Sequence, residues 1–313
     1  MAQSNDEKEL DRRHFLKCMA WVGTGAVWTL SSGVLKGSPL GQMHRATTAP
    51  TPGELRFVQI SDSHIGFDKP ANTDVTATLR AAIAKIKAEA EQPSFILHTG
   101  DLTHLSKPAE FDTLQQVLSE LSLPIFYVPG EHDVLEDDGK SYLQRFGKGT
   151  RGAGWHSFDQ NGVHFIGLVN VVNLRAGGLG TLGHEQLEWL EQDVKHVMSS
   201  TPIVVFAHIP LWSVYPEWGW GTDDSAQALS YLKRFGSVSV LNGHIHQVLQ
   251  KVEGHVTFHT AMSTAFPQPA PGSAPKPGPM KIPEAEARRM IGVREVTYVP
   301  GKQPLAVVDA TLG

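Results

Sequence analysis

The sequence predicts a layered α/β fold, and two observations support this. Beyond residue 53, short apolar segments typical of strands alternate with segments typical of helices, which is the order expected when helices cover the faces of a sheet. The chain has 313 residues, of which 41% are hydrophobic and 19% are charged, so it can bury a sizeable core in one large domain or two small ones.

Three apolar strands and two helices are expected in the first half of this alternation. The strands are expected at 54–60, 94–99 and 124–128, and the helices at 73–91 and 108–121. The first helix is rich in Ala, Lys and Glu, which are good helix formers. The second begins with Pro108, because proline is well tolerated in the first turn of a helix.

The second half adds a hairpin, more helices and strands, and one long loop. The hairpin is expected at 155–159 and 163–169, helices at 183–198, 223–235 and 284–291, and strands at 202–208, 237–243, within 247–260, at 292–299 and at 305–311. Residues 267–283 are so rich in proline that neither a helix nor an interior strand is expected there. We therefore predict one domain over 54–313, with a Pro-rich loop at 267–283.

The N-terminal segment, residues 1–37, is predicted to be an export signal. Arg12 and Arg13 are followed by His-Phe-Leu-Lys and then by an uncharged, weakly apolar stretch over 18–35. This resembles a twin-arginine signal, whose pattern is Arg-Arg-x-Phe-Leu-Lys, except for Asp11 in place of the usual Ser or Thr. This predicts passage through the twin-arginine export machinery and a periplasmic or otherwise extracytoplasmic location. The alternative is an uncleaved membrane anchor, because the stretch is just long enough to span a bilayer. Residues 38–53 are then a linker.

The charge and the reactive residue types narrow the chemistry. The net charge is −5 and no cluster of Lys and Arg is present in the sequence, so nucleic acid is not an expected partner. The single cysteine, Cys18, lies in the signal segment, so the exported protein is expected to have no disulfide. Fifteen histidines favour imidazole and carboxylate chemistry over thiol chemistry.

Carboxylate or imidazole side chains follow five successive apolar strands. In chain order they are Asp62 and His64, Asp101, Glu131 with His132 and Asp133, His208, and His244 with His246. Ligands bind at the carboxyl edge of open α/β sheets, so we expect these groups to converge. Converging carboxylates repel one another unless cations compensate, and oxygen and imidazole ligands together suit Mn, Fe, Zn, Ni or Co.

The spacing within the clusters supports a shared target. Residues two apart in an extended backbone project to the same side, so Asp62 and His64 are expected to reach one ion, and His244 and His246 two neighbouring ones. The glycines at 100, 130 and 243 are expected to permit a sharp turn and a close approach of the backbone.

In this order the clusters resemble the pattern of the calcineurin-like metallophosphoesterases, which include purple acid phosphatases and cyclic-nucleotide phosphodiesterases. The family pattern is Asp-x-His, Gly-Asp, Gly-Asn-His-Asp or Glu, His, and Gly-His-x-His, and the match spans roughly residues 54–260. The resemblance implies a four-layer α/β/β/α sandwich, in which two facing mixed sheets are flanked by helices.

The resemblance also implies two metal ions per chain, of Mn, Fe or Zn. The implied ligands are Asp62, His64, Asp101 and His246 for one ion, and the bridging Asp101 with Glu131, His208 and His244 for the other. A hydroxide between the ions would attack the phosphorus of a mono- or diester. His132 would stabilise the developing charge or protonate the leaving oxygen, and Asp133 would orient its ring.

Glu131 is the one departure from the family pattern, which has Asn at this position. Glutamate supplies an anion in place of a neutral amide oxygen and offers no N–H donor. With Asp62, Asp101 and the hydroxide it brings the negative charge to four, which two divalent ions neutralise. A neutral centre attracts a monoester dianion less, so we predict either a preference for monoanionic diesters or a trivalent ion such as Fe³⁺.

The loop at 211–221 is the candidate substrate loop, because it is crowded with aromatic residues directly after His208. Its four aromatic members are Trp212, Tyr215, Trp218 and Trp220, and they are expected either to pack in the core or to contact a base, acyl or aryl group. His98 and His104 flank Gly100 and Asp101, and for His104 a hydrogen-bonded structural role is favoured over a place in the cleft. Asn170 and Asn173 are expected to be turn residues.

Two classes of function remain open from the sequence. The first is an exported phosphoesterase that acts on a small phosphoester or a lipid headgroup. The second is a non-catalytic, metal-binding periplasmic protein on the same fold, in which Glu131 has abolished turnover. The retention of His132 and Asp133, which are not needed merely to hold metal, favours the enzyme.

Overall fold

The computed structural model describes residues 26–31, 34–39, 53–302 and 305–313. Residues 1–51 and 52–313 form two separate units. In the first unit β1 (Ala26–Ser31) and β2 (Val34–Pro39) pair antiparallel. The paired arginines and most of the linker lie outside the described residues, so the export signal stays a prediction. None of the helices in the described ranges has the length and apolarity needed to cross a membrane.

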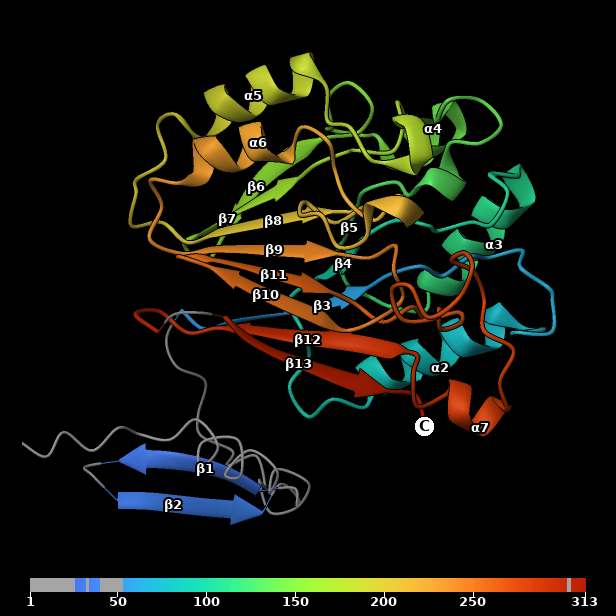
Figure 1. Ribbon diagram of the computed structural model, residues 1–313, viewed down its shortest axis with the longest axis horizontal. Helices are drawn as coiled ribbons and strands as arrows, with labels where there is room; N and C mark the ends of the chain where they lie inside the picture. Colours follow the sequence, from blue (N-terminus) through green and yellow to red (C-terminus); the bar gives the residue numbers. More distant parts are fainter. Residues whose placement is uncertain (1–25, 32–33, 40–52, 303–304) are drawn as a thin grey trace, which may run out of the picture. The chain divides into compact units, whose positions relative to one another are not determined.

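Two mixed sheets form the centre of the second unit (Figure 1). The five-stranded sheet has the order β13 (Ala306–Thr311), β12 (Gly292–Tyr298), β3 (Leu55–Ile60), β4 (Ile96–His98) and β5 (Ile125–Tyr127). The six-stranded sheet has the order β10 (Leu249–Glu253), β11 (Val256–Thr260), β9 (Val238–Asn242), β8 (Ile203–Ala207), β7 (Val163–Gly167) and β6 (His156–Gln160). The strands β3–β5 run parallel, as do β7, β8, β9 and β11.

Helices cover the outer face of each sheet. The helices are α2 (Val75–Lys87), α3 (Pro108–Leu118), α4 (Lys140–Phe146), α5 (His184–Val194), α6 (Ser225–Leu232) and α7 (Glu284–Ala287). One apolar cluster joins α2 and α3 to the five-stranded sheet, and another joins α5 and α6 to the six-stranded sheet. The predicted four-layer sandwich is therefore confirmed.

Aromatic packing holds the two sheets face to face. Phe57 of the five-stranded sheet stacks on Phe95 at 5.1 Å and meets Phe165 of the opposite sheet edge to face at 5.4 Å. These rings belong to a buried apolar cluster drawn from both sheets. Close-packed protein interiors resist deformation. This packing therefore fixes the carboxyl ends of the strands in the two sheets relative to one another.

The structure also differs from the sequence expectations at several elements. The helix expected over 284–291 is only the single turn α7, and α4 was not predicted at all. The Pro-rich loop at 267–283 contains neither helix nor strand, as expected. Proline fixes its backbone and removes the donors that regular structure needs.

His164 on β7 lies between two carboxylates and predicts a pH-dependent stability. Its Nδ1 is 2.8 Å from Asp159, its Nε2 is 2.9 Å from Asp193, and the ring is buried. Burial opposes ionisation, but the hydrogen bonds and charges of Asp193 and Asp159 raise the pKa of His164 above its usual value. A raised pKa stabilises the fold below the unfolded value of about 6.5, and that contribution is lost as pH rises through the folded value.

We therefore expect Asp193→Asn to remove part of the stability at pH 6 and little at pH 9. The ion pair that is lost is largely buried, with side-chain exposures of 7% for His164 and 16% for Asp193, and the difference should be about 1 kcal/mol. Urea unfolding of both proteins at the two pH values measures it, because the other titrating groups are common to both. Equal losses at pH 6 and pH 9 would contradict the assignment.

Candidate metal centre

The candidate site lies where the carboxyl ends of strands from both sheets meet. Segments after β3, β4 and β5 enter it from one sheet, and segments after β8 and β9 enter it from the other. Gln59 ties the two sides together beneath the site, because its amide donates to Thr99 Oγ1 at 3.0 Å and to the carbonyl of Asn242 at 3.2 Å. The convergence predicted from the strand ends is therefore observed.

Asp62, His64 and His246 form the first of two triads of candidate ligands, and all three are buried. His246 Nε2 lies 3.2 Å from Asp62 Oδ1 and 3.2 Å from His64 Nε2. The other nitrogen of His246, Nδ1, faces the carbonyl of Phe266 at 2.6 Å and donates to it. That bond places the lone pair of His246 Nε2 toward the centre of the triad.

Glu131, His208 and His244 form the second triad. The two carboxylate oxygens of Glu131 lie 2.9 Å from His208 Nε2 and 2.9 Å from His244 Nδ1. His208 Nδ1 donates to the carbonyl of Thr99 at 2.7 Å, so its Nε2 lone pair also faces inward. Glu131 therefore lies among the candidate ligands despite its departure from the family pattern.

Asp101 lies between the two triads. Its Oδ2 is 3.5 Å from His64 Nε2 in the first triad and 3.4 Å from His208 Nε2 in the second. Its Oδ1 accepts the backbone N–H of His132 at 2.9 Å. One carboxylate thus contacts both triads and also positions the residue proposed for proton transfer.

The backbone at the site is not extended, and the expectation that extended geometry aligns Asp62 with His64 is wrong. Among the described non-glycine residues, eight have a positive φ, and five of these are candidate ligands: Asp62, His64, Asp101, His244 and His246, with φ between 43° and 69°. Left-handed backbone is costly for residues with a Cβ, and such strain concentrates at functional sites. The surrounding contacts have to hold it, including the N–H of His244 on the Asp62 carboxylate at 3.1 Å.

Two glycines are required by close approach, as the sequence predicted. A Cβ on Gly130 would lie 2.1 Å from Asp101 Oδ1, and one on Gly243 would lie 2.0 Å from Ser61 Oγ. Since real Cβ atoms do not come so near, any other residue would displace the Asp101 carboxylate or the loop that carries Asp62.

The electrostatics of the site call for additional positive charge. Burial opposes ionisation of Glu131, but the charges of His244 and His208 hold its pKa well below the usual value. Burial also opposes the charged form of His208, yet Asp101 and Glu131 raise its pKa well above the usual value. A proton on His208 thus compensates the carboxylates, and a metal ion bound at its Nε2 would take the place of that proton.

The residues present fit a pair of transition-metal ions. Despite the short distances in the second triad, Glu131 Oε2, His208 Nε2 and His244 Nδ1 are buried without a properly aligned hydrogen bond. Buried polar atoms of this kind need a partner, and three of them facing a common point are typical of a metal site. Mixed imidazole and carboxylate donors suit Mn, Fe or Zn.

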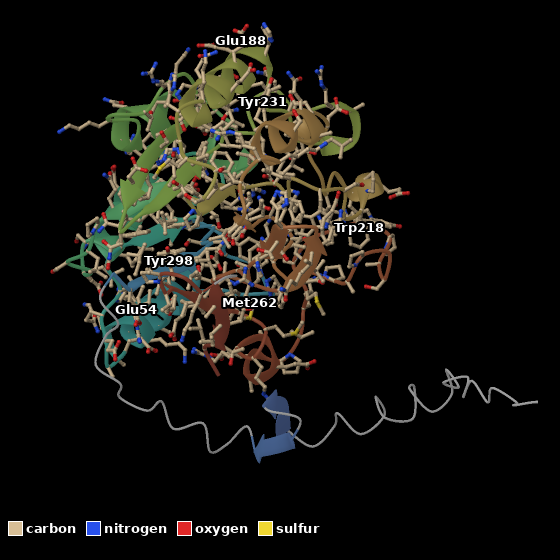
Figure 2. The ribbon with its side chains drawn as sticks, turned by 90° about the vertical axis from the view of Figure 1, so that its left-hand side faces the viewer. Glu54, Glu188, Trp218, Tyr231, Met262 and Tyr298 are labelled. Atoms are coloured by element: carbon tan, nitrogen blue, oxygen red, sulfur yellow. The ribbon has the colours of Figure 1, made fainter. Side chains whose placement is uncertain are left out.

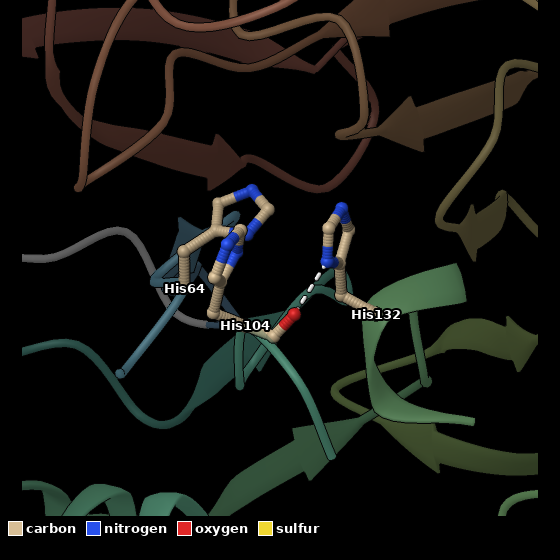
Figure 3. Close-up of side chains that lie close together, drawn as sticks. All are labelled: His64, His104 and His132. Carbon is tan, nitrogen blue, oxygen red and sulfur yellow. Dashed lines mark hydrogen bonds between the residues drawn. The ribbon is translucent and has the colours of Figure 1, made fainter. Parts of the chain in front are cut away.

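His132 stands beside the triads with one ring nitrogen free. Its Nδ1 donates to the carbonyl of His104 at 2.6 Å, which leaves Nε2 directed away from that bond (Figure 3). Burial opposes its charged form, but Asp101, Glu131 and the His104 carbonyl raise the pKa of His132. The ring lines the cavity above the triads, where it can hydrogen-bond a ligand.

The prediction that Asp133 orients the His132 ring is wrong. The buried carboxylate of Asp133 accepts backbone N–H groups from Gly130 at 2.9 Å, Leu102 at 3.0 Å and Thr103 at 2.8 Å. The three-residue turn η3 (Glu131–Asp133) points Asp133 into the loop after β4. Asp133 therefore joins the two ligand loops, and its charge helps to raise the pKa of His132 without a hydrogen bond to the ring.

His104 lies in the cleft, contrary to the structural role favoured from the sequence. Its ring stacks on that of His132 at 5.0 Å and 16° (Figure 3). It also meets Phe67 edge to face and lines the cavity. Burial, followed by the charge of His132, lowers the pKa of His104 to about 4, so the ring is neutral. The sequence feature that could have indicated a place in the cleft is its position three residues after the candidate ligand Asp101.

Only two of the four aromatic residues of the candidate substrate loop line the cavity. Trp218, at the end of η5 (Pro216–Trp218), and Trp220 line it; Figure 2 shows Trp218 on a loop at the margin of the domain. Trp212 packs instead against Phe258, with ring centroids 5.2 Å apart. Tyr215 packs edge to face against Trp218, also with ring centroids 5.2 Å apart. Of the two alternatives expected from the sequence, packing against neighbouring aromatic rings is thus the one observed for Trp212 and Tyr215, which do not line the cavity.

Asn170 is structural, as the sequence suggested. Its buried amide donates to the carbonyl of Ile209 at 2.8 Å and to Thr222 Oγ1 at 2.9 Å. These bonds fix both ends of the aromatic loop.

Three comparisons with known proteins agree with this geometry. Residues 55–248 match the family model described as calcineurin-like phosphoesterase. The chain is 26% identical to a 3′,5′-cyclic-nucleotide phosphodiesterase of Nostoc sp. over 68% of this chain and 79% of that protein. It is 25% identical to a glycerophosphodiester phosphodiesterase of Enterobacter lignolyticus over 78% and 90%. A dimetal phosphatase from Danio rerio shares the fold, with a TM-score of 0.57 and 14% identity over 82% of this chain and 98% of that one.

Proposed function

The chain belongs to the calcineurin-like phosphoesterase family, and from this premise we propose that it is an exported hydrolase that uses two metal ions and prefers phosphodiesters. One observation supports the proposal most strongly: Asp101 contacts both ligand triads and also holds the backbone of His132. Both relatives named above are phosphodiesterases of small molecules.

The side chains divide the chemistry between them. Two bound cations would lower the pKa of water toward about 7 and neutralise charge on the phosphate oxygens. The two triads and Asp101 would hold these ions, and the rings of His208 and His246 are fixed in the tautomer that directs a lone pair inward. His132, protonated at Nε2, would donate to a phosphate oxygen or to the leaving oxygen as the P–O bond breaks. The carbonyl of His104 keeps the ring in the orientation for that transfer.

The diester preference is proposed from Glu131. Both of its carboxylate oxygens face histidines of the second triad, so it adds a full negative charge where Asn would add none. The centre is therefore one charge less positive than with Asn. A monoester dianion loses more attraction than a diester monoanion, because Coulomb energy scales with the product of the charges.

We expect Glu131→Asn to raise the monoester-to-diester ratio of kcat/KM about tenfold, in keeping with one unit of charge at a few ångströms. Protein reconstituted with Mn²⁺ is assayed on aryl phosphate monoesters and diesters that share one leaving group. Glu136→Asn, the same change at an exposed position outside the triads, is the control. An unchanged ratio and unchanged metal content in Glu131→Asn would refute the preference.

A non-catalytic metal-binding protein on the same fold remains the second candidate. It would explain Glu131 as the change that abolished turnover, but it leaves the fixed ring of His132 without a role.

The export proposal rests on Arg12 and Arg13 in the N-terminal sequence. To test export, both arginines are changed to lysine and the periplasmic fraction is analysed. The proposal predicts that the protein is lost from that fraction.

A further inference from the structure

The cavity above the two triads has a wall that the proposed hydrolysis does not itself require. Its volume is about 420 Å³, which is within the range of small-molecule sites. Three separate loops supply the outer wall, through Leu174, Trp218 with Trp220, and the prolines at 277 and 279. Phe67 and Phe266 continue the apolar lining toward the first triad.

The tryptophan part of this wall is held in place by its neighbours. Trp220 is fully buried, and Trp218 packs against it edge to face at 5.0 Å. The backbone of the loop that carries Leu174 joins the tryptophan loop through the N–H of Gly180, which donates to the carbonyl of Gly221 at 2.9 Å. Gly219 approaches that loop so closely that a Cβ would lie 2.7 Å from the carbonyl oxygen of Gly177.

The proline part of the wall is tied to a candidate metal ligand. Gln268 donates to the carbonyl of His244 at 3.1 Å and accepts the N–H of Gly278 at 3.0 Å. Gln247, three residues after His244, donates to the carbonyl of Gln268 at 3.0 Å. The wall is therefore formed before any ligand binds, so a ligand would not have to order it.

The lining offers few hydrogen bonds to a ligand apart from the triads and His132. Besides Asp101, the other side chains with polar atoms that line the cavity are Lys69, His104, Gln268 and, through their indole N–H groups, Trp218 and Trp220. Both ends of the Gln268 amide are already used, and Lys69 is exposed, with its Nζ 5.8 Å from the Phe67 ring centroid. A site that recognises a nucleobase by its edge needs a fixed set of donors and acceptors, whereas this cavity offers apolar contact and aromatic faces.

We propose that the substrate is a phosphodiester with one bulky apolar substituent, an alkyl, acyl or aryl group, which lies against Trp218, Leu174 and the prolines. This rests on the proposed function, because the phosphate has to lie at the triads. The other alcohol is small or polar and faces the open side. Selection is then made by buried apolar area, which favours larger substituents at a fixed phosphate chemistry.

Ethanolamine phosphodiesters that carry a methyl, hexyl or phenylethyl group test this. In each hydrolysis water adds to phosphorus, one P–O bond breaks, and the alcohol leaves with a proton, so total released alcohol measures turnover. We expect kcat/KM of the Mn²⁺-loaded protein to be about 30-fold higher for the hexyl and phenylethyl esters than for the methyl ester, which corresponds to full burial of about two to three additional methylenes at about fourfold each.

Two variants locate the effect. Trp218→Ala and Leu174→Ser, on two neighbouring loops of the wall, should each lower the hexyl-to-methyl ratio at least threefold, and the ratio is independent of the fraction of folded, metal-loaded protein. Leu174 is 42% exposed, so its replacement leaves the core intact. Leu135→Ser is the matched control, because Leu135 is 57% exposed and does not line the cavity, and it should keep the native ratio.

The outcomes separate this inference from the proposed function. Measurable turnover with equal rates for methyl and hexyl esters would overturn the substrate class and leave the hydrolase intact. A native preference that both wall variants retain would overturn the placement of the substituent. No turnover of any ester with Mn²⁺, Fe²⁺ or Zn²⁺ would overturn the proposed function, and the inference with it.

Discussion

Replacing His132 by alanine is expected to lower kcat about 10²- to 10⁴-fold, the usual contribution of a positioned general acid. The His104 carbonyl holds Nδ1 and leaves Nε2 for the ligand in the cavity. Because the ring belongs to neither of the two triads around Asp101, the variant should keep its metal content. Steady-state kinetics on a diester and elemental analysis of the same sample measure both quantities.

The metal content decides between two roles of this ring. A ring nitrogen of His132 also lies within 4.8 Å of carboxylate oxygens of Asp101 and Glu131, so geometry alone would permit it to coordinate an ion. Loss of one ion together with activity in His132→Ala would make it a ligand and contradict the proton-transfer role. His184→Ala, at a histidine that is 83% exposed, is the matched control and should change neither quantity.

The strand-end pattern was sufficient to predict which ligands meet. Side chains after β3, β4, β5, β8 and β9 converge because the carboxyl ends of parallel strands share an edge, and two facing sheets bring two such edges together. Residues as far apart as Asp62 and His246 were therefore predictable as neighbours. The layered fold followed from the same alternation of strands and helices.

The local geometry was not predictable, for a physical reason. Asp62 and His244 adopt left-handed backbone, which local propensity disfavours and which tertiary contacts impose here. The partner of the His132 ring could not be read from the sequence either, because it is a backbone carbonyl. Every type of residue at position 104 would have a backbone carbonyl. Nothing in the sequence therefore indicated that this carbonyl, and not the side chain of the neighbouring Asp133, would bind the ring of His132.

The wall of the cavity shows the same limit. The aromatic residues after His208 indicated a role near the ligand edge, but only packing separates Trp218, which lines the cavity, from Trp212, which faces Phe258. The prolines at 277 and 279 predicted a loop and gave no indication that it would return to the site. The hydrogen bonds of Gln268 provide that return.

Removal of metal is expected to abolish turnover, and turnover should return only when two ions are bound to each chain. Asp101 Oδ2 lies 3.5 Å from His64 Nε2 in one triad and 3.4 Å from His208 Nε2 in the other, so its carboxylate could contact an ion held in either triad. With one triad filled, the other retains uncompensated carboxylate and no partner for the phosphate charge. Activity should therefore depend on the second ion as much as on the first.

The most direct test of a two-metal centre is titration of chelator-treated, metal-free protein with Mn²⁺, with activity and bound metal followed together. The proposal predicts that activity on a diester rises to a plateau at two bound ions per chain, and that Asp101→Asn retains fewer than two ions and does not reach that plateau. Full activity at one bound ion, or undiminished activity in the metal-free protein, would contradict it.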